Sequence, residues 1–140
     1  MNIKFKKLDP KATIPSRAHP SDAGMDLVAV SKSAGNKYSF IEYGTGLAME
    51  IPAHCVGLIF PRSSVSKTSL SLRNCVGVID SSYRGEIKLR FSIDNGANKE
   101  YYIQDKIGQL IVFELPNMEV LEVGELSNTD RGSGGFGSTD

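Results

Sequence analysis

Apolar and polar residues alternate with a period of two in several short stretches of this 140-residue chain. In residues 86–93, every second side chain from Ile87 to Ile93 is apolar. In a β-strand these side chains share one face, and the polar ones share the other. The next residues, Asp94-Asn95-Gly96, are types that tolerate the left-handed backbone of a hairpin turn. The pattern therefore predicts a strand over 86–93 that ends in a turn.

Other short apolar stretches are separated closely by Gly and Pro, which is typical of strands. They are residues 3–8, 25–30, 38–43, 47–51, 55–60, 107–115 and 120–123. There is little room for helix, and the one candidate is residues 63–69, where a serine could cap the first turn. Many short strands at regular spacing predict an all-β fold, a jelly-roll-like β-sandwich or barrel with one short helix.

Composition narrows the possible partners. Sixteen Lys and Arg residues balance sixteen Asp and Glu residues, so the formal net charge is zero. A chain without a global positive field is not expected to bind nucleic acid or an anionic membrane, although a local anion site remains possible. No apolar run approaches the roughly 18 residues of a spanning helix, and the first residues do not resemble a signal peptide. We expect a soluble, cytoplasmic protein with a single core.

The cysteines and histidines do not form a metal-binding pattern. Cys55 and Cys75 lie twenty positions apart, so we expect two buried small hydrophobes in preference to a disulfide or a metal site. His19 and His54 have no partner cluster in the sequence. A zinc site needs three or four ligands at workable spacing, and the sequence offers none.

The last fourteen residues, 127–140, have four glycines and one large apolar residue. They cannot bury enough surface to offset the entropy of ordering, so we expect a β domain over 1–126 and a flexible arm over 127–140. The plain interpretation is a functionless tail. Arg131, however, carries a guanidinium group, which can donate two parallel hydrogen bonds to a phosphate. Phe136 is unusual in a solvated tail unless something stacks on its ring. Together they favour a lid that closes on a phosphorylated aromatic ligand.

Four earlier stretches carry polar groups next to predicted strands. They are 23–27 with Asp26, 61–66 with Arg62 and three serines, 74–86 with Asp80 and Tyr83, and 105–110 with Gln109. Taken singly, each has a plain alternative, such as a turn or a serine-capped helix with a surface arginine. Hydroxyls, free N–H groups and an arginine at a helix start are also suited to an anion. A carboxylate at the end of a buried strand can orient and deprotonate water.

In order and spacing, these five stretches resemble the five motifs of the homotrimeric dUTPase family, from about residue 20 to residue 139. Residues 77–85 and 131–139 are the most specific. The resemblance implies a jelly roll, three chains around a threefold axis, and sites that borrow residues from neighbouring subunits. It implies hydrolysis of dUTP to dUMP and pyrophosphate with Mg²⁺, by attack of water on the α-phosphate.

The resemblance also implies residue roles. Asp80 would be the general base, Tyr83 would pack beneath the deoxyribose and exclude a 2′-hydroxyl, and Asp26 would act on Mg²⁺ through bound water. The uracil edge would be read at residues 74–78, and the tail would close over the site. The residues expected to bind substrate are Arg62, Ser63, Ser64, Asn74, Cys75, Gly77, Val78, Ile79, Asp80, Tyr83, Lys88, Gln109, Arg131, Gly135, Phe136, Gly137, Ser138 and Thr139.

The chain departs from the family pattern around the phosphates. Ser64 stands where glycine is usual, and Val65-Ser66 replaces the common Leu-Ala. Lys106 and Gly108 replace the more usual Arg and Ala, and the segment between 63 and 74 is about one residue shorter than in typical members. These changes concern the phosphate cradle and the short helix and leave the base and sugar pocket intact.

Three alternatives stand beside this interpretation. A dCTP deaminase or bifunctional deaminase–dUTPase has a similar core but lacks the glycine-rich tail with arginine and phenylalanine. A dUTPase-fold protein that mainly binds a regulatory partner would be expected to lose Asp80 or Arg131, and both are present. A structural β-sandwich without a site would not carry five ordered motifs. A partner role in addition to catalysis stays open.

Overall fold

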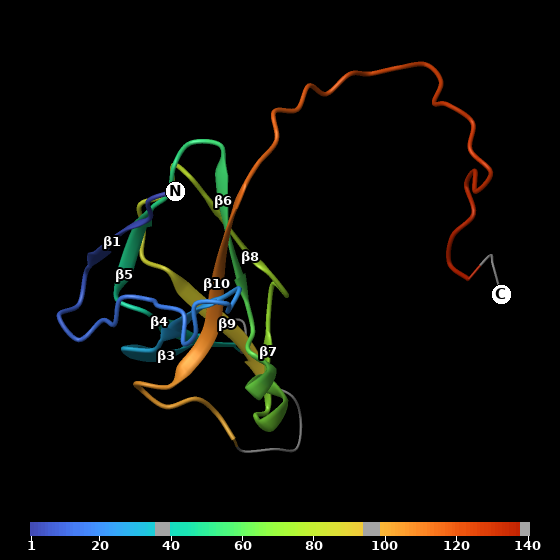
Figure 1. Cartoon of the computed structure of the whole chain (residues 1–140). Coiled ribbons are helices and arrows are strands. Elements are labelled where there is room, and N and C mark those ends of the chain that lie inside the picture. Colours follow the sequence, from blue (N-terminus) through green and yellow to red (C-terminus); the bar gives the residue numbers. More distant parts are fainter. Residues whose placement is uncertain (36–39, 94–98, 138–140) are drawn as a thin grey trace.

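The computed structural model describes residues 1–35, 40–93 and 99–137. Figure 1 shows a body of short strands from which a long C-terminal arm leaves. The strands are β1 (Lys4–Lys7), β2 (Met25–Val28), β3 (Ser31–Gly35), β4 (Phe40–Gly44), β5 (Leu47–Glu50), β6 (Cys55–Phe60), β7 (Leu70–Leu72), β8 (Gly77–Asp80), β9 (Lys88–Ile93) and β10 (Lys106–Glu114). The single helical element in the described ranges is a 3₁₀-helix, η1 (Ser63–Lys67).

The strands form two four-stranded sheets and one two-stranded ribbon. The sheet orders are β2-β10-β6-β8 and β3-β4-β9-β7, and β1 pairs with β5. Every pairing is antiparallel. Inward side chains of both sheets, such as Leu27 and Leu110 from one and Ile41 and Leu89 from the other, belong to one buried cluster. The prediction of an all-β, jelly-roll-like fold is therefore confirmed.

An aromatic trio lies in the middle of this core. The ring of Tyr43 contacts Phe91 and Tyr101 edge-on at centroid distances of 5.8 and 6.0 Å, and Phe91 contacts Tyr101 at 5.6 Å. The Tyr43 hydroxyl donates to the main-chain oxygen of Tyr101, 3.0 Å away. This bond fixes the segment before β10 against β4, so the loop that leads to Gln109 is held by the core.

Most of the strand predictions agree with the structure, but two strands were missed and one was wrong. β3 has the sequence Ser-Lys-Ser-Ala-Gly, which lacks an apolar period, and its pairing with β4 makes it a strand. β7 is only three residues long. The predicted strand 120–123 is wrong, because that segment is irregular in the structure. The turn expected at 94–96 and the start of the strand expected at 38–43 lie outside the described residues.

The predicted strand at 120–123 is absent because of where this segment lies. From here on, the arm means all of the chain after β10, which ends at Glu114. A strand needs the backbone of a neighbour, and Figure 1 shows the arm curving away from the body after β10. Val120 is 94% exposed, and the other large apolar side chains of the arm are also exposed. The chain itself therefore offers this segment neither a pairing strand nor an apolar surface.

Two other predictions need correction. η1 is a 3₁₀-helix whose N-cap is Arg62, and no serine caps it. The hydroxyls of Ser66 and Thr68 instead donate to the carbonyls of Ser63 and Val65. Cys55 is buried as expected, but Cys75 is exposed, and neither forms a disulfide. Cys75 is exposed because it lies in the turn before β8, where its backbone has a φ of 60°.

Candidate active site

Asp26 and Arg62 form the centre of a charged site at one edge of the first sheet. Asp26 on β2 lies opposite Gln109 on β10. One carboxylate oxygen of Asp26 is 2.8 Å from Arg62 Nε, and the other is 2.7 Å from Lys106 Nζ. Both oxygens of this carboxylate are therefore paired with cations in the free chain. Lys106 lies in the stretch 105–110 that the sequence singles out, but its pairing with Asp26 was not predicted.

Gln109 is placed by a close contact and a hydrogen bond. Its amide Nε2 donates to the carbonyl of Pro61, 3.0 Å away. A Cβ at Gly24 would overlap the Gln109 side-chain oxygen, so a larger residue here would displace the Gln109 side chain. We call the resulting cavity of about 310 Å³ the Asp26 hollow; it is lined by Ala18, Asp22, Ala23, Gly24, Asp26, Arg62, Ser63, Lys106 and Gln109. Of the predicted phosphate ligands it includes Arg62, Ser63 and Gln109, while Ser64 faces a neighbouring cavity with Tyr101.

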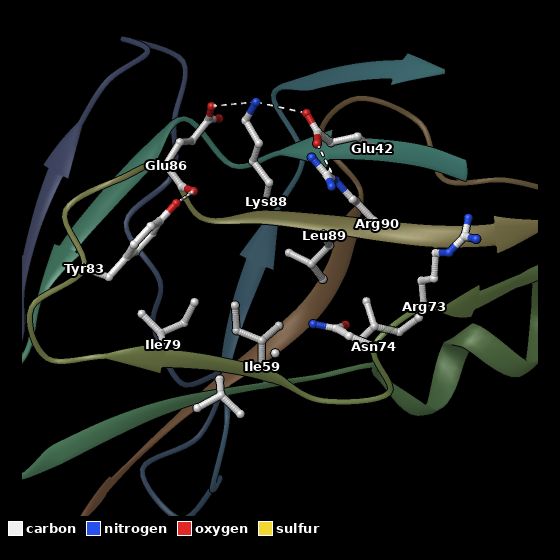
Figure 2. Close-up of a pocket in the computed structure, with 13 residues that line it drawn as sticks. Glu42, Ile59, Arg73, Asn74, Ile79, Tyr83, Glu86, Lys88, Leu89 and Arg90 are labelled. Carbon is white, nitrogen blue, oxygen red and sulfur yellow. Dashed lines mark hydrogen bonds and ion pairs between the residues drawn. The ribbon is translucent and has the colours of Figure 1, made fainter. Parts of the chain in front are cut away.

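A second cavity, of about 430 Å³, lies between β8 and β9 (Figure 2). We call it the Tyr83 hollow. Six of the predicted substrate ligands line it, namely Asn74, Gly77, Val78, Ile79, Tyr83 and Lys88. Its floor is apolar, with Ile59, Leu72 and Leu89, and its rim carries charged side chains. A flat ring with a polar edge fits such a lining.

The chain holds Tyr83 in place from both sides. Its amide donates to the carbonyl of Asp80, and its hydroxyl donates to the carbonyl of Glu86, each at 3.0 Å. A Cβ at Gly85 would overlap the Tyr83 ring. The turn after β8 therefore fixes the ring against the rim of the hollow, as Figure 2 shows.

A row of alternating charges crosses the rim and was not predicted. Lys88 Nζ lies 2.9 Å from Glu42 and 3.7 Å from Glu86, and Arg90 Nε lies 2.7 Å from Glu42. The hydrogen bond from Lys88 lowers the pKa of Glu42 against the effect of burial, and Arg90 lowers it further. The same bond raises the pKa of Lys88. Sequence alternation puts Lys88 and Arg90 on one face of a strand, but only the strand pairing reveals Glu42, which lies opposite Arg90 and diagonal to Lys88.

Asp80 does not have the buried setting expected for it. It ends β8, which is an edge strand of its sheet, and its side chain is exposed. Its neighbour Val78 is 64% exposed. Across the described ranges, its carboxylate has no hydrogen bond or ion pair. Asp80 lines neither the Tyr83 hollow nor the Asp26 hollow.

The two hollows are separate within one chain and share no lining residue. Asp26 and Asp80 are on the two outer strands of one sheet, β2 and β8. Three strand spacings put them about 14 Å apart across the sheet. Across the sheet, Asp26 is aligned with Phe60 of β6, and Asp80 is aligned with Val56 of the same strand. The two positions on β6 add a separation of about 13 Å along the strands. One chain does not bring these carboxylates together.

The predicted arm residues contact neither hollow in this chain. Arg131 Nε donates to the carbonyl of Gly134, 3.0 Å away, within a local turn. Phe136 is fully exposed, and Gly135 and Gly137 lie beside it. Figure 1 shows this part of the arm far from the body. Ser138 and Thr139 lie outside the described residues.

The described residues contain no group of three or more His, Cys, Asp or Glu side chains that could hold a metal ion by themselves. Within the Asp26 hollow, the carboxylate that pairs with both Arg62 and Lys106 is that of Asp26. In the same described ranges, no helix has the length and hydropathy to cross a membrane.

Comparison with known proteins identifies the family of this chain. The dUTPase family model matches residues 10–140. The deoxyuridine 5′-triphosphate nucleotidohydrolase of Rhodococcus erythropolis is 41% identical over 99% of this chain and 86% of its own length. The protein of the same name from Clostridium acetobutylicum is 38% identical over 99% of this chain and 97% of its own length.

Solved structures give the same result. A variant of the Staphylococcus bacteriophage 80alpha dUTPase, solved with dUpNHpp, is 25% identical with a TM-score of 0.84 and covers 99% of this chain and 98% of that chain. Another structure of this phage enzyme with the same compound is 27% identical, with a TM-score of 0.80, and covers 99% of this chain and 98% of that chain. The match of the family model over nearly the whole chain, together with relatives of about 40% identity, establishes that the chain belongs to the dUTPase family.

Proposed function

We propose that this protein is a dUTP pyrophosphatase that hydrolyses dUTP to dUMP and pyrophosphate by attack of water on the α-phosphate. Its relatives carry the name deoxyuridine 5′-triphosphate nucleotidohydrolase. One observation carries the proposal. This chain of the dUTPase family has two separate hollows: the ring-sized Tyr83 hollow beside an edge strand, and the cationic Asp26 hollow. These suit the base with its sugar and the phosphates, respectively.

The Tyr83 hollow supports selection of the base and the sugar. β8 is an edge strand, so its outer side presents unpaired backbone N–H and C=O groups. At Gly77 and Val78 these groups can pair with the uracil edge as a partner base does, with the carbonyl of Cys75 and the side chain of Asn74 beside them. Cytosine carries an amino group where uracil has a carbonyl oxygen. This amino group would face N–H donors of the chain and find no acceptor. The clamped ring of Tyr83 leaves no space for a ribose 2′-hydroxyl.

The Asp26 hollow supports binding of the phosphates. Arg62 and Lys106 supply positive charge, and Ser63, Ser64 and Gln109 supply donors for phosphate oxygens. The Asp26 carboxylate suits Mg²⁺ carried by the triphosphate, since Mg²⁺ keeps several waters and needs only one or two carboxylates besides the phosphates. When bound, Mg²⁺ would offset the charge that develops on the leaving pyrophosphate. Asp26 would contact its water shell.

The distance between the two halves supports a homotrimer with shared sites. Attack requires the reacting atoms to lie about 3–3.5 Å apart, whereas Asp80 and Asp26 of one chain are separated by about 14 Å across the sheet and about 13 Å along it. A triphosphate in the Asp26 hollow therefore needs the Asp80 of another chain as its base. The exposed, unpaired carboxylate of Asp80 is free to take that part.

The arm completes the proposal. Arg131 would neutralise the terminal phosphate, Phe136 would cover the uracil, and Gly135 and Gly137 would let the backbone approach closely. Ser138 and Thr139 would add phosphate contacts. Because the arm leaves the body of its own chain in Figure 1, it would close over the site of a neighbour. Since nucleoside triphosphates are made and used inside cells, we further propose a cytoplasmic location.

Pyrophosphate release tests the function. The protein is incubated with Mg²⁺ and, in turn, with dUTP, dTTP, dCTP and UTP. Release from dUTP, and little from the other three, is expected. Equal release from UTP would contradict the role of Tyr83, and release from dCTP with formation of deoxyuridine would indicate the deaminase alternative.

A further inference from the structure

Tyr101 carries a buried hydroxyl for which the described part of the chain offers no hydrogen-bond partner. The residue is only 6% exposed. Its ring is packed edge-on against Phe91 and Tyr43, and its carbonyl accepts the Tyr43 hydroxyl. The ring is therefore held in the core. A buried polar group without a partner costs folding free energy, so such a group in a native core calls for a reason.

The neighbours of this hydroxyl are among the residues proposed above to bind the phosphates, which we call the phosphate cradle: Arg62, Ser63, Ser64, Lys106 and Gln109. Tyr101, Ser64 and Arg62 line one cavity, and Arg62 also lines the adjacent Asp26 hollow. Burial raises the pKa of Tyr101, while Ser64 and then Arg62 oppose that shift. The phenol stays protonated at neutral pH and is therefore a donor. Ser64 lies beside it, but the two hydroxyls do not meet hydrogen-bond geometry in the free chain.

Ser64 accepts from Arg62 in this state. Its Oγ lies 3.4 Å from Arg62 Nη1, which is a long bond. The same guanidinium is held at 2.8 Å by Asp26. An oxyanion in the cradle would draw Arg62 towards itself, which removes the weak donor from Ser64. A serine oxygen has two lone pairs and one proton, so Ser64 can then accept from Tyr101 and donate to the oxyanion.

We propose, on the basis of the function proposed above, that Tyr101 is a positioning residue of the phosphate cradle, whose hydroxyl orients Ser64 towards a phosphoryl oxygen. No proton is transferred: Tyr101 keeps its proton and shares it with Ser64 Oγ, and Ser64 shares its own with the oxyanion. The usual glycine at position 64 of the family has no hydroxyl to orient.

The first test separates this role from a structural one. Tyr101→Phe removes only the hydroxyl, and because that hydroxyl is unpaired in the free protein, its loss should leave the ligand-free Tm unchanged or raise it. Binding of pyrophosphate and of dUpNHpp should weaken by roughly 3–10-fold, which corresponds to one neutral hydrogen bond. KM for dUTP should rise by a similar factor with kcat almost unchanged. Tyr102→Phe is the matched control, since Tyr102 is 75% exposed.

The second test is a double-mutant cycle with Ser64→Gly. If Tyr101 acts through Ser64, Tyr101→Phe should have no further effect on pyrophosphate affinity once Ser64 is glycine. Equal losses in both backgrounds, or a fall of the ligand-free Tm in Tyr101→Phe, would overturn the proposal. Comparison of inorganic phosphate, pyrophosphate, dUMP and dUpNHpp identifies the phosphoryl group concerned: an effect confined to pyrophosphate and dUpNHpp points to the terminal phosphates, and an effect with dUMP to the α-phosphate.

Failure of this inference can be told apart from failure of the proposed function. The ligand-free Tm and the affinity for pyrophosphate are measured without any turnover. If wild-type protein released no pyrophosphate from dUTP, the proposed function would fall while the Tyr101–Ser64 coupling could still be measured. If turnover were normal and the coupling absent, only the role of Tyr101 would fall.

Discussion

The Asp26 carboxylate lies 2.8 Å from Arg62 Nε, so the free protein neutralises the arginine that would bind substrate phosphate. Lys106 neutralises the second carboxylate oxygen at 2.7 Å. A phosphate that enters the Asp26 hollow must therefore compete with Asp26 for two cations. A triphosphate that arrives with Mg²⁺ relieves this competition, because the carboxylate then faces the hydrated cation.

Asp26→Asn should change the metal dependence of binding. With the carboxylate gone, Arg62 and Lys106 are free, so pyrophosphate should bind more tightly without Mg²⁺, by several-fold in calorimetry. The stimulation of dUTP turnover by Mg²⁺ should fall sharply. Asp22→Asn is the control, since Asp22 lines the same hollow but its carboxylate accepts the His19 amide. Unchanged metal dependence in Asp26→Asn would refute the role of Asp26.

Asp80→Asn tests the general base. The variant should still bind dUTP, because Asn keeps the size of the side chain and the residues that line both hollows are unchanged. Turnover should fall by roughly 10²–10⁴-fold, the usual contribution of a general base. Single-turnover pyrophosphate release, with dUTP affinity measured in parallel, gives both quantities. Near wild-type turnover would place the base elsewhere.

Glu42→Gln should show how much the row of charges at the rim of the Tyr83 hollow stabilises the fold. The pKa of Glu42 is lowered from its ordinary value of 4.5, mainly by Lys88. A carboxyl with a lowered pKa stabilises the fold above its unfolded pKa, and this contribution is lost as pH falls through the folded pKa. At neutral pH, Glu42→Gln should therefore be less stable by about 1 kcal/mol.

The pH dependence provides the check on Glu42. Denaturant unfolding at several pH values should show a constant difference between wild type and Glu42→Gln above pH 4.5. The difference should shrink as the pH falls further, because both proteins then lack the charge. Glu50→Gln is the control, since its pair with Lys4 is exposed and should matter little. A difference that grew on acidification would have the wrong sign.

The sequence predicted the fold wherever local period and burial coincide. Residues 86–93 alternate in sequence, and Ile87, Leu89 and Phe91 are buried as predicted. β3 escaped prediction because its strand character comes from pairing with β4 and from no pattern of its own. The opposite error arose at 120–123, where an apolar run has no neighbour in its own chain. Local pattern reports what a segment can form, and pairing decides whether it forms.

The site was predicted as a set of residues but not as a geometry. Six ligands around the Tyr83 hollow and three around the Asp26 hollow do lie together. The contacts that hold them come from strand register and core packing, which no motif specifies. Examples are Glu42 with Lys88 and the Glu86 carbonyl with Tyr83. The pairing of Lys106 with Asp26 is another. The exposure of Asp80 was missed because a strand's place at a sheet edge is a property of topology.

Assembly should be visible in solution. Shared sites predict a trimer of about three times the chain mass of 15.2 kDa. Multi-angle light scattering at several concentrations measures this mass directly. The exposed apolar side chains of the arm, such as Val120 and Leu121, would gain cover in such an assembly. A stable and fully active monomer would contradict the shared-site proposal.

Deletion of the arm after Asn128 should separate stability from activity. The removed segment buries little in the chain, so the fold and Tm should be almost unchanged. Turnover should fall sharply, because an arginine that contacts transferring phosphate can contribute several kcal/mol. Phe136→Ala should do less harm, with the loss of one stacking contact of roughly 1–3 kcal/mol. A deletion that lowered Tm strongly would mean that the arm is part of the folded body.

Mixed trimers decide whose arm closes over whose base. Chains deleted after Asn128 keep Asp80, and Asp80→Asn chains keep the arm, so each preparation alone should have little activity. If base and arm come from different subunits, a random equal mixture should restore both in about a quarter of the sites, the product of two independent halves. Activity should then rise well above either parent after the chains exchange, which mass spectrometry of intact trimers can verify. Verified mixed trimers without recovery would mean that each arm closes over the base of its own chain.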